Sequence, residues 1–515
     1  MPLVILPDLF LTPRGLVDLR FSRVVGGGCR LVLTEVEVKI ISQPRSSFMK
    51  PKIRFLAALI CLIATAPVLA AEQIDYNHRL TSSGAVPEYP IAYVVPSAKE
   101  VKAVVDRVGH YVMTNTSLRV FDNKTGVEIT NADLAHPNPN AVIDSRYTPF
   151  NRWDYPNGVT WSAFYRVADV TGDKSYADFP PRVYDWIFTW MPYFREQEKQ
   201  TGKATVFSKM VNMAALDHCG AISAGMIRTQ LRSPDPRFRQ WADVVADYIS
   251  NGQFRLPDGT LARERPQPVS VWSDDFYMGI SFLTQMGRLT SNDSNKSGGN
   301  KYWNDAIKQV VQGSARLFDP AMCLYAHGWS ENTGDYNPRM FWGRANGWCA
   351  LAMTELLAEL PTAYPGRDKV LHYYRQLMRG LVEQQDASGL WHNVLTRHDT
   401  YLETSASAMF VYALARGVNE GWLSPIFGPP AITGWNGLAT RVLPDGRVSG
   451  ICEGTTYASD FTYYTYRGAG SDTVFVGPVL YAGAEVIRLL ENPKLQISAP
   501  KPNAVNSALL MKAKD

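Results

Sequence analysis

The chain has 515 residues, of which 46% are hydrophobic, 19% charged and 11% aromatic, with 13 Trp and 25 Tyr. This composition excludes a disordered or fibrous protein and allows either three domains or one large repetitive domain. Of the 52 Lys/Arg and 48 Asp/Glu residues, residues 1–71 hold nine and four, which leaves 43 and 44 in residues 72–515. A body so close to neutral argues against a nucleic-acid-binding protein.

A targeting segment begins at Met49, where the chain reads MKPKIRF, then LAALICLIATAPVLA, then AEQ. This order predicts a secretory signal peptide over 49–71, cleaved after Ala70 or Ala71. An uncleaved anchor is the alternative, since the apolar run is close to the short limit of a membrane span. Residues 1–48 precede the signal peptide, so we expect a gene-model extension or an unstructured segment; a real extra segment is the alternative.

The predicted export implies a periplasmic or secreted protein that does not contact the membrane after cleavage. We expect a monomer or a homodimer. The mature chain keeps four cysteines, too few for a disulfide scaffold: Cys219, Cys323, Cys349 and Cys452. The sequence has no CxxC pair, no HExxH motif and no P-loop. We therefore expect neither a metal ion nor a cofactor.

Residues 98–492 alternate between two kinds of helical pattern. Segments of one kind are small and apolar nearly all round, which places them inside: 157–170, 217–231, 274–286, 344–360, 403–418 and 473–490. Segments of the other kind carry charges along one face, which places them outside: 99–113, 176–200, 237–249, 301–317, 367–385 and, more weakly, 423–442. The alternation predicts an all-α fold, an (α/α)6 barrel, as one domain over 98–492 between a lead-in (72–97) and a tail (493–515).

Gly-bearing loops join outer segments to the next inner ones at the same place in the repeat: LPDGTLARE (256–264), DASGLWHN (386–393) and LPDGRVSG (443–450). They should lie at one end of the barrel and allow short strands there. Asp217, Asp274 and Arg344 each begin an inner segment. All three should therefore meet at that end, in a concave pocket.

The densest polar group is VWSDDFYM, residues 271–278, where Asp274 and Asp275 stand side by side at a helix start between aromatic residues. Asp is also a common N-cap, so this pattern alone leaves capping and catalysis open. Asp217 holds the matching position in the preceding inner segment, and two carboxylates facing one pocket are typical of enzymes that cleave sugar linkages. A helix N-terminus favours the ionised form, whereas apolar walls and a neighbouring carboxylate favour the neutral form.

A second motif, FWGRANGW over 341–348, puts Arg344 and Trp348 four residues apart on one helix face. Arg binds carboxylates through its fork of donors, and indole stacks on flat rings. The alternative is an internal ion pair beneath a core Trp. His327, in the sequence AHGW, is a further polar candidate whose alternative is a structural role.

Several ordered motifs resemble the unsaturated glycosyluronyl hydrolases: ARERPQPVSVWSDDFYMGISFL, FWGRANGWCALAM, YLETSASAMFVYALARGV, GICEGTT and VGPVLYAGAEVIRLL. The resemblance covers most of residues 95–492. It is closer to glycoside hydrolase family 105, the unsaturated rhamnogalacturonyl hydrolases, than to the family 88 unsaturated glucuronyl hydrolases. It implies an (α/α)6 barrel that needs no cofactor and removes the 4,5-unsaturated uronic acid from the non-reducing end of lyase-generated oligosaccharides.

The implied reaction is hydration of a vinyl ether. A protonated Asp delivers a proton to C4, positive charge develops at C5 beside the ring oxygen, water adds there, and the hemiketal opens. By position in the motifs, the resemblance implies that Asp274 is the general acid/base and Asp217 the second active-site carboxylate, with Asp275 as the competitor for the acid role. It implies substrate contacts for Trp272, Arg344, Trp348 and, more loosely, His327.

The chain departs from the family at Arg263, where some members have a His eleven residues before the catalytic Asp. The resemblance places this residue near the leaving sugar, where extra positive charge suggests an acidic or sulfated neighbour. We expect unsaturated galacturonyl-rhamnose from rhamnogalacturonan as the substrate. The alternatives are the same chemistry on unsaturated glucuronyl saccharides from ulvan or glycosaminoglycans, and a non-catalytic carbohydrate-binding toroid.

Overall fold

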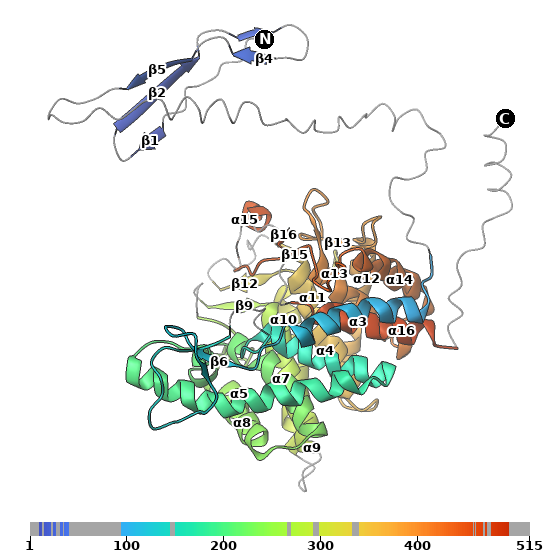
Figure 1. Ribbon diagram of the computed structural model, residues 1–515. Helices are drawn as coiled ribbons and strands as arrows, with labels where there is room; N and C mark the ends of the chain where they lie inside the picture. The colour runs from blue at the N-terminus through green and yellow to red at the C-terminus, as the bar shows by residue number, and fades with distance from the viewer. Residues whose placement is uncertain are drawn as a thin grey trace, which may run out of the picture. The chain divides into compact units, whose positions relative to one another are not determined.

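The computed structural model describes backbone strands within residues 10–40, and then residues 94–144, 150–264, 269–291, 298–331, 339–456, 458, 460–466, 469–470 and 475–493. The chain divides into two units, Met1–Val86 and Pro87–Asp515. The predicted signal peptide and nearly all of the predicted lead-in and tail lie outside the described residues. Figure 1 shows the described residues coloured by residue number, from blue at the N-terminus to red at the C-terminus.

The first unit contains short antiparallel strands: β1 (Phe10–Thr12), β2 (Gly15–Phe21), β3 (Val24–Gly26), β4 (Leu31–Leu33) and β5 (Val36–Ile40). Their sheet orders are β1-β2-β5 and β3-β4. The expectation for residues 1–48 is a gene-model extension or an unstructured segment, whereas VEVKI at 36–40 alternates apolar and polar residues, which is the strand period. Whether translation begins at Met1 or Met49 stays a prediction.

The second unit is built from two rings of helices. The inner helices are α4 (Tyr155–Thr171), α7 (Gly220–Arg232), α9 (Ser281–Ser291), α11 (Gly343–Glu359), α13 (Thr404–Asn419) and α16 (Gly477–Leu490). The outer helices are α3 (Ala98–Thr114), α5 (Lys174–Thr201), α8 (Pro236–Asp247), α10 (Gly298–Leu317), α12 (Arg367–Glu383) and α14 (Gly428–Ala439). Each inner helix packs on the next, and α16 packs on α4, which closes the ring and confirms the (α/α)6 barrel.

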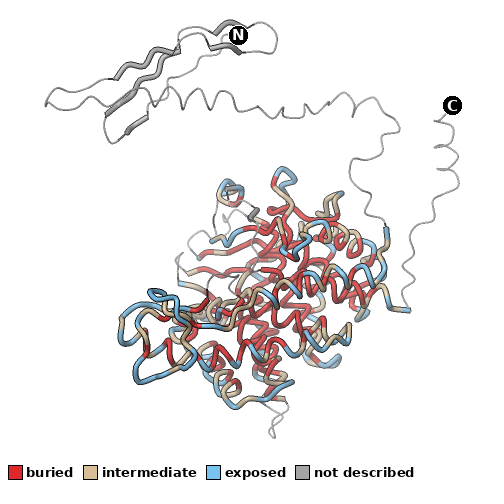
Figure 2. Tube along the Cα trace, in the orientation of Figure 1, coloured by how far each residue is buried: buried red, intermediate tan, exposed pale blue. Residues whose placement is uncertain are grey.

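Burial separates the two rings as their sequences predicted. Residues 403–415, at the start of α13, are all buried, whereas α3 buries only Val101, Val105, Val108, Gly109 and Val112. The three- and four-residue spacing in α3 is one face of an amphipathic helix. The buried core in Figure 2 therefore consists mainly of the inner helices and of one face of each outer helix.

The three predicted glycine loops form the same turn at the same place in the repeat. Gly259, Gly389 and Gly446 have φ of 87°, 85° and 89°, the left-handed region that glycine adopts without strain. In each turn the glycine N–H donates to the carbonyl of the residue three positions before it. Short strands accompany these turns, so the sequence predicted both their position and their chemistry.

The remaining elements are short. The strands are β6 (Val120–Asp122), β7 (Glu128–Ile129), β8 (Ala141–Ile143), β9 (Ser270–Trp272), β10 (Phe318–Asp319), β11 (Leu324–Tyr325), β12 (Gly328–Ser330), β13 (Trp391–His392), β14 (Leu402–Glu403), β15 (Ile451–Cys452) and β16 (Ala469–Gly470). The short helices are α6 (Ser208–Val211), η1 (Leu216–His218), η2 (Tyr248–Gly252), η3 (Phe276–Ile280), η5 (Pro425–Phe427) and α15 (Phe461–Tyr466). The pairs β9-β12, β10-β11, β13-β14 and β15-β16 connect loops of the barrel, and β7-β6-β8 form a small sheet between α3 and α4.

Two further observations concern the predictions made from composition. In the described part of the chain, Cys219, Cys323, Cys349 and Cys452 are all free and buried. No helix among the described residues combines the length and the hydropathy that crossing a bilayer requires.

Candidate active site

Asp274 and Asp275 stand where strand β9 turns into the helical segment η3–α9. Strand β9 pairs with β12, so that Trp272 lies opposite Gly328. Ser273 fixes the turn, because its N–H donates to the His327 carbonyl at 2.9 Å and its Oγ to the Ala326 carbonyl at 2.6 Å. The π-helical segment η3 follows at once, a geometry that is frequent at functional sites.

Asp274 bonds to a buried histidine. Its Oδ2 lies 3.0 Å from His327 Nε2, and His327 Nδ1 lies 2.7 Å from the Tyr464 hydroxyl. The imidazole is fully buried, whereas the Asp274 side chain is 16% exposed. Either tautomer of His327 satisfies this chain: Nε2–H donates to an Asp274 carboxylate, and an unprotonated Nε2 accepts from an Asp274 carboxylic acid. The arrangement therefore accommodates both protonation states of Asp274.

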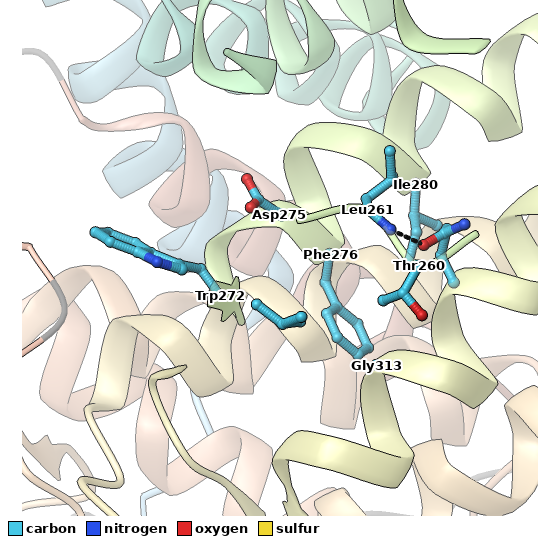
Figure 3. A pocket seen from close by; sticks show the side chains of 9 residues that line it. Thr260, Leu261, Trp272, Asp275, Phe276, Ile280 and Gly313 are labelled. Atoms are coloured by element: carbon cyan, nitrogen blue, oxygen red, sulfur yellow. Dashed lines mark hydrogen bonds between the residues drawn. The ribbon is translucent and has the colours of Figure 1, made fainter. Parts of the chain in front are cut away.

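Asp275 turns toward a different partner. Arg263 donates to it through both edges of the guanidinium, from Nε to Oδ2 at 2.9 Å and from Nη2 to Oδ1 at 2.7 Å. The Asp275 side chain is only 4% exposed. Figure 3 shows its carboxylate turned away from the ring of Phe276, which points toward Gly313 in a small internal cavity. The two adjacent aspartates thus occupy separate environments.

Asp217 lies in η1, in the turn just before α7. Arg263 reaches it as well, with Nη1 3.2 Å from Oδ2 and Nη2 3.4 Å from Oδ1. The Asp217 side chain is 31% exposed, the most open of the three carboxylates. The predicted meeting of Asp217 and Asp274 at one end of the barrel is confirmed, because Arg263 bridges Asp217 to the neighbour of Asp274.

Arg344, near the start of α11, is buried beside the same group. It donates to the Cys452 carbonyl at 2.7 Å and to the Glu453 carbonyl at 2.9 Å, and its Cζ lies 4.9 Å from the centre of the Trp342 ring. Within the described part of the chain, no carboxylate lies within ion-pair distance of this guanidinium. Its hydrogen bonds and its ring contact are therefore with neutral groups.

The two predicted tryptophans are buried walls of the site. Trp272 is 3% exposed, and the guanidinium carbon of Arg263 lies 4.3 Å from its ring centre. Trp348 is 1% exposed and stacks on Tyr277 with ring centres 5.2 Å apart. Their faces are occupied by protein groups, so their predicted contact with the substrate stays a prediction.

The surroundings shift the pKa values of the adjacent aspartates in opposite directions. Burial raises the pKa of Asp274, but His327, Arg263 and Arg344 together hold it below its usual value. Burial raises the pKa of Asp275 above its usual value in spite of Arg263, and the charges of Asp217 and Asp274 add to that rise. Asp274 is thus the more readily ionised of the two.

Sequence reasoning missed two residues of the site. Tyr155, at the start of α4, lies close enough to Arg344, Asp217 and Asp274 to feel their charges, while burial raises the pKa of its phenol. It begins an inner helix, so the register that identified Asp217 and Asp274 also marks this position. Tyr464 belongs to α15, an insertion between α14 and α16 that no periodic pattern identifies.

The described residues contain no group of three or more His, Cys, Asp or Glu side chains arranged to hold a metal ion. They bring together three groups: the Asp274 carboxyl bonded to His327, the Asp217 carboxyl bonded to Arg263, and the buried Arg344 guanidinium bonded to two carbonyls. These groups suit general acid/base chemistry on an anionic substrate.

A family model decides the relationship. The model for Glycosyl Hydrolase Family 88 matches residues 127–490, most of the barrel. The chain belongs to this family. It is therefore a glycoside hydrolase, and the resemblance found in its motifs is confirmed. The catalytic assignments of individual residues rest on geometry and stay predictions.

Among curated proteins, the chain is 28% identical over 341 residues to the unsaturated rhamnogalacturonyl hydrolase YesR of Bacillus subtilis, covering 64% of this chain and 90% of that protein. It is 28% identical over 224 residues to an unsaturated 3S-rhamnoglycuronyl hydrolase of Formosa agariphila, covering 43% of this chain and 58% of that protein.

Solved structures support the fold. A GH105 candidate from Salmonella enterica superposes with a TM-score of 0.60 at 20% identity, covering 78% of this chain and 96% of that chain. One from Klebsiella pneumoniae gives a TM-score of 0.61 at 19% identity, covering 78% and 99%. At these identities the likeness concerns the barrel alone.

Proposed function

We propose that this glycoside hydrolase removes a 4,5-unsaturated uronic acid from the non-reducing end of lyase-generated oligosaccharides, with unsaturated galacturonyl-rhamnose from rhamnogalacturonan as the preferred substrate. The observation that carries the proposal is the pairing of Asp274 on a buried histidine with Arg344, a buried cation that has no described carboxylate partner. A uronate supplies the carboxylate that Arg344 lacks, and its vinyl ether is the acceptor for the Asp274 proton. The name of YesR supports the choice of rhamnogalacturonan.

The proposed reaction is the hydration that the family resemblance implies, with these groups in its roles. The Asp274 carboxyl gives its proton to C4 of the double bond, and the ring oxygen stabilises the positive charge that develops at C5. Water adds to C5 and returns a proton to the Asp274 carboxylate, which regenerates the acid. The hemiketal then opens and releases the shortened oligosaccharide. Asp217, which lies beside Arg263 and is partly exposed, orients the water.

Asp274, whose pKa lies below its usual value, donates a proton only if the bound substrate raises that pKa. Arg344 is one of the groups that lower this pKa, and a bound uronate carboxylate neutralises it. The substrate also excludes water and brings a negative charge close to Asp274, and both effects favour the neutral acid. We therefore expect activity to fall on the alkaline side, as Asp274 loses its proton.

One assay tests the proposed function. The purified protein is mixed with rhamnogalacturonan digested by a lyase, and loss of the double-bond absorbance is followed. We expect the absorbance to fall, with no release of sugar from the saturated oligosaccharides of the same polymer. Equal cleavage of saturated glycosides, or binding without consumption of the unsaturated ones, would contradict the proposal.

A second substrate is favoured by one observation, the name of the Formosa agariphila relative, which points to a uronate linked to rhamnose. The same assay with ulvan and glycosaminoglycan digests measures this alternative. Arg263 does not support an acidic or sulfated neighbour, because Asp275 and Asp217 already balance its charge.

We further propose that the protein is exported as a monomer or homodimer, with a signal peptide beginning at Met49, and that it acts in the periplasm or outside the cell. The support is the order of basic, apolar and small residues in 49–71. N-terminal sequencing of the mature protein should find residue 71 or 72 first. A mature chain that retains residues before Met49 would contradict this.

A further inference from the structure

Two backbone hydrogen bonds to Ser270 fix the position of Arg263. It ends the glycine hairpin of 254–263, and its N–H and carbonyl each bond to Ser270 at 2.8 Å. Ser270 opens β9, the strand that leads directly to Asp274 and Asp275. The arginine and the acids are therefore carried by paired segments whose relative positions vary little.

The Arg263 guanidinium contacts three side chains. One edge binds Asp275 in two parallel bonds, the Nη groups reach Asp217, and one face lies on the Trp272 ring. Bidentate binding combined with stacking fixes the plane of an arginine, which a lysine cannot reproduce. With 15% of its side chain exposed, Arg263 offers little surface to a leaving sugar.

The two carboxylates differ in what they depend on. Asp275 is 4% exposed and saturated by Arg263. Asp217 is 31% exposed, and among the described residues Arg263 is the group that binds its carboxylate. Asp275 thus anchors the arginine, while the direction of the Asp217 side chain depends on the arginine.

We propose that Arg263 is a positioning residue: anchored by Asp275 and Trp272, it holds Asp217 as an oriented carboxylate beside Asp274. This assignment rests on the proposed function, and it replaces the expected contact of Arg263 with the leaving sugar. It also gives the Asp275 carboxyl an anchoring role in place of the acid role.

The first test compares Arg263→Gln and Arg263→Lys on the substrate that the wild-type enzyme consumes. We expect Arg263→Gln to lower kcat by about 100-fold with KM within a few-fold, since misplacing a catalytic group by about 1 Å costs that much. Arg263→Lys should recover only part of the loss, and Asp275→Asn should follow Arg263→Gln. A raised KM with unchanged kcat would overturn the proposal in favour of a leaving-sugar contact.

The pH profile separates positioning from a merely structural role. Three groups lower the pKa of Asp274: His327, Arg263 and Arg344. The carboxyls of Asp275 and Asp217 and the phenol of Tyr155 also lie in the site. Removing the Arg263 charge raises the pKa of Asp274. Because the acid must be protonated, the alkaline limb of kcat/KM should then move to higher pH in Arg263→Gln. An unmoved limb would contradict the proposal.

Arg255→Gln is the matched control. Arg255 lies on the same hairpin and binds Asp305 in two bonds, at 3.0 and 2.8 Å, away from the three carboxylates. Arg255→Gln should leave kcat within about two- to three-fold and the alkaline limb of the pH profile unmoved.

A crystal structure of Arg263→Gln gives a readout independent of any substrate. It should show the Asp217 side chain turned from its position while the Asp274–His327 bond remains, and an unmoved Asp217 would overturn the proposal. If wild-type protein consumed no unsaturated oligosaccharide, the proposed function would fail while this structural test stood.

Discussion

The two ends of the barrel treat buried charge differently. At the N-terminal ends of the inner helices, Asp274 is partly exposed, and Arg344 donates to two carbonyls without an ion pair to a described carboxylate. At their C-terminal ends, Glu355 of α11 lies between Arg228 of α7 and Arg416 of α13. The inner helices thus carry buried ion pairs at their C-terminal ends, and at their N-terminal ends a buried arginine that is not ion-paired with a described carboxylate.

The C-terminal end continues this pairing around the ring. Glu485 of α16 is fully buried and accepts from Arg166 of α4 at 2.6 Å and from Asn419 of α13 at 2.8 Å. Buried charges that are fully paired contribute to structure, and breaking such a pair is costly. Charges left partly unpaired by the protein are available to a ligand. The comparison locates the site without reference to sequence motifs.

The largest expected effect is that of Asp274→Asn. Asn preserves the shape and a bond to His327 but cannot donate the proton, so kcat should fall by at least about 1,000-fold. The measurement is the double-bond absorbance with the unsaturated disaccharide. The control is Asp258→Asn, because Asp258 lies on the surface of the glycine hairpin of 254–263. Turnover near that of the wild type would move the acid role to another residue.

At the opposite end, Glu355→Gln should destabilise the fold without changing the chemistry. It removes the carboxylate that both Arg228 and Arg416 share, and leaves each with one longer ion pair, to Glu359 at 3.6 Å and to Glu485 at 3.8 Å. Breaking such a buried network costs about 3–5 kcal/mol of unfolding free energy. Denaturant titration measures this loss, while kcat of the folded enzyme should stay unchanged. A variant of normal stability with reduced kcat would remove the distinction between the two ends.

The pH dependence of stability should change in the same variant. Burial raises the pKa of Glu355, but Arg228 and Arg416 hold it below its usual value. A lowered pKa contributes stability above the unfolded value of about 4.3 and loses it as the pH falls through the folded value. Glu355→Gln should therefore lose less stability on acidification than the wild type.

Arg344→Gln sharpens the comparison from the side of the substrate. Removing a charged hydrogen-bond donor to the uronate costs about 1.5–3 kcal/mol, which corresponds to a rise in KM of about 10- to 100-fold. Steady-state kinetics with the unsaturated disaccharide measures it. The control is Arg232→Gln. Arg232 forms a surface ion pair with Asp169 at the C-terminal end of α7, so its replacement should leave KM unchanged. An equal effect of both variants would argue against a specific role for Arg344.

The smallest expected effect is that of Tyr464→Phe. The hydroxyl holds His327 Nδ1 at 2.7 Å, and losing one neutral hydrogen bond costs about 1 kcal/mol, or roughly five-fold in kcat. Tyr463→Phe is the control, since its hydroxyl bonds Thr456, 2.8 Å away. Identical kinetics for both variants would show that the hydrogen bond between Tyr464 and His327 does not affect the reaction at Asp274.

The sequence predicted most of the barrel because its helices differ in composition. Helix α11 is apolar on all sides and α12 on one side only, so each can be assigned to its ring from local pattern. The boundaries differ where local chemistry intervenes. The segment predicted from 423 begins as α14 at Gly428, with prolines at its first turn, and the segment predicted from 274 opens with the π-helical η3.

For the site, repeat register and motif resemblance identified Asp217, Asp274, Arg344 and His327 before any coordinates. They did not show that Arg263 binds two carboxylates, that Tyr464 completes the chain from His327, or that Asp274 and Asp275 bind different partners. Each of these contacts joins residues from different segments of the chain. No local pattern encodes their distance.

The sequence by itself thus determined the two rings, the end at which the acids gather and the family to which the chain belongs. Periodicity, turn chemistry and motif order are local properties, which a linear chain carries in full. Only the tertiary structure decided which carboxylate faces which cation, and so which acid is tuned and which is an anchor. Charge interactions depend on distance and burial, and both arise only when remote segments pack together.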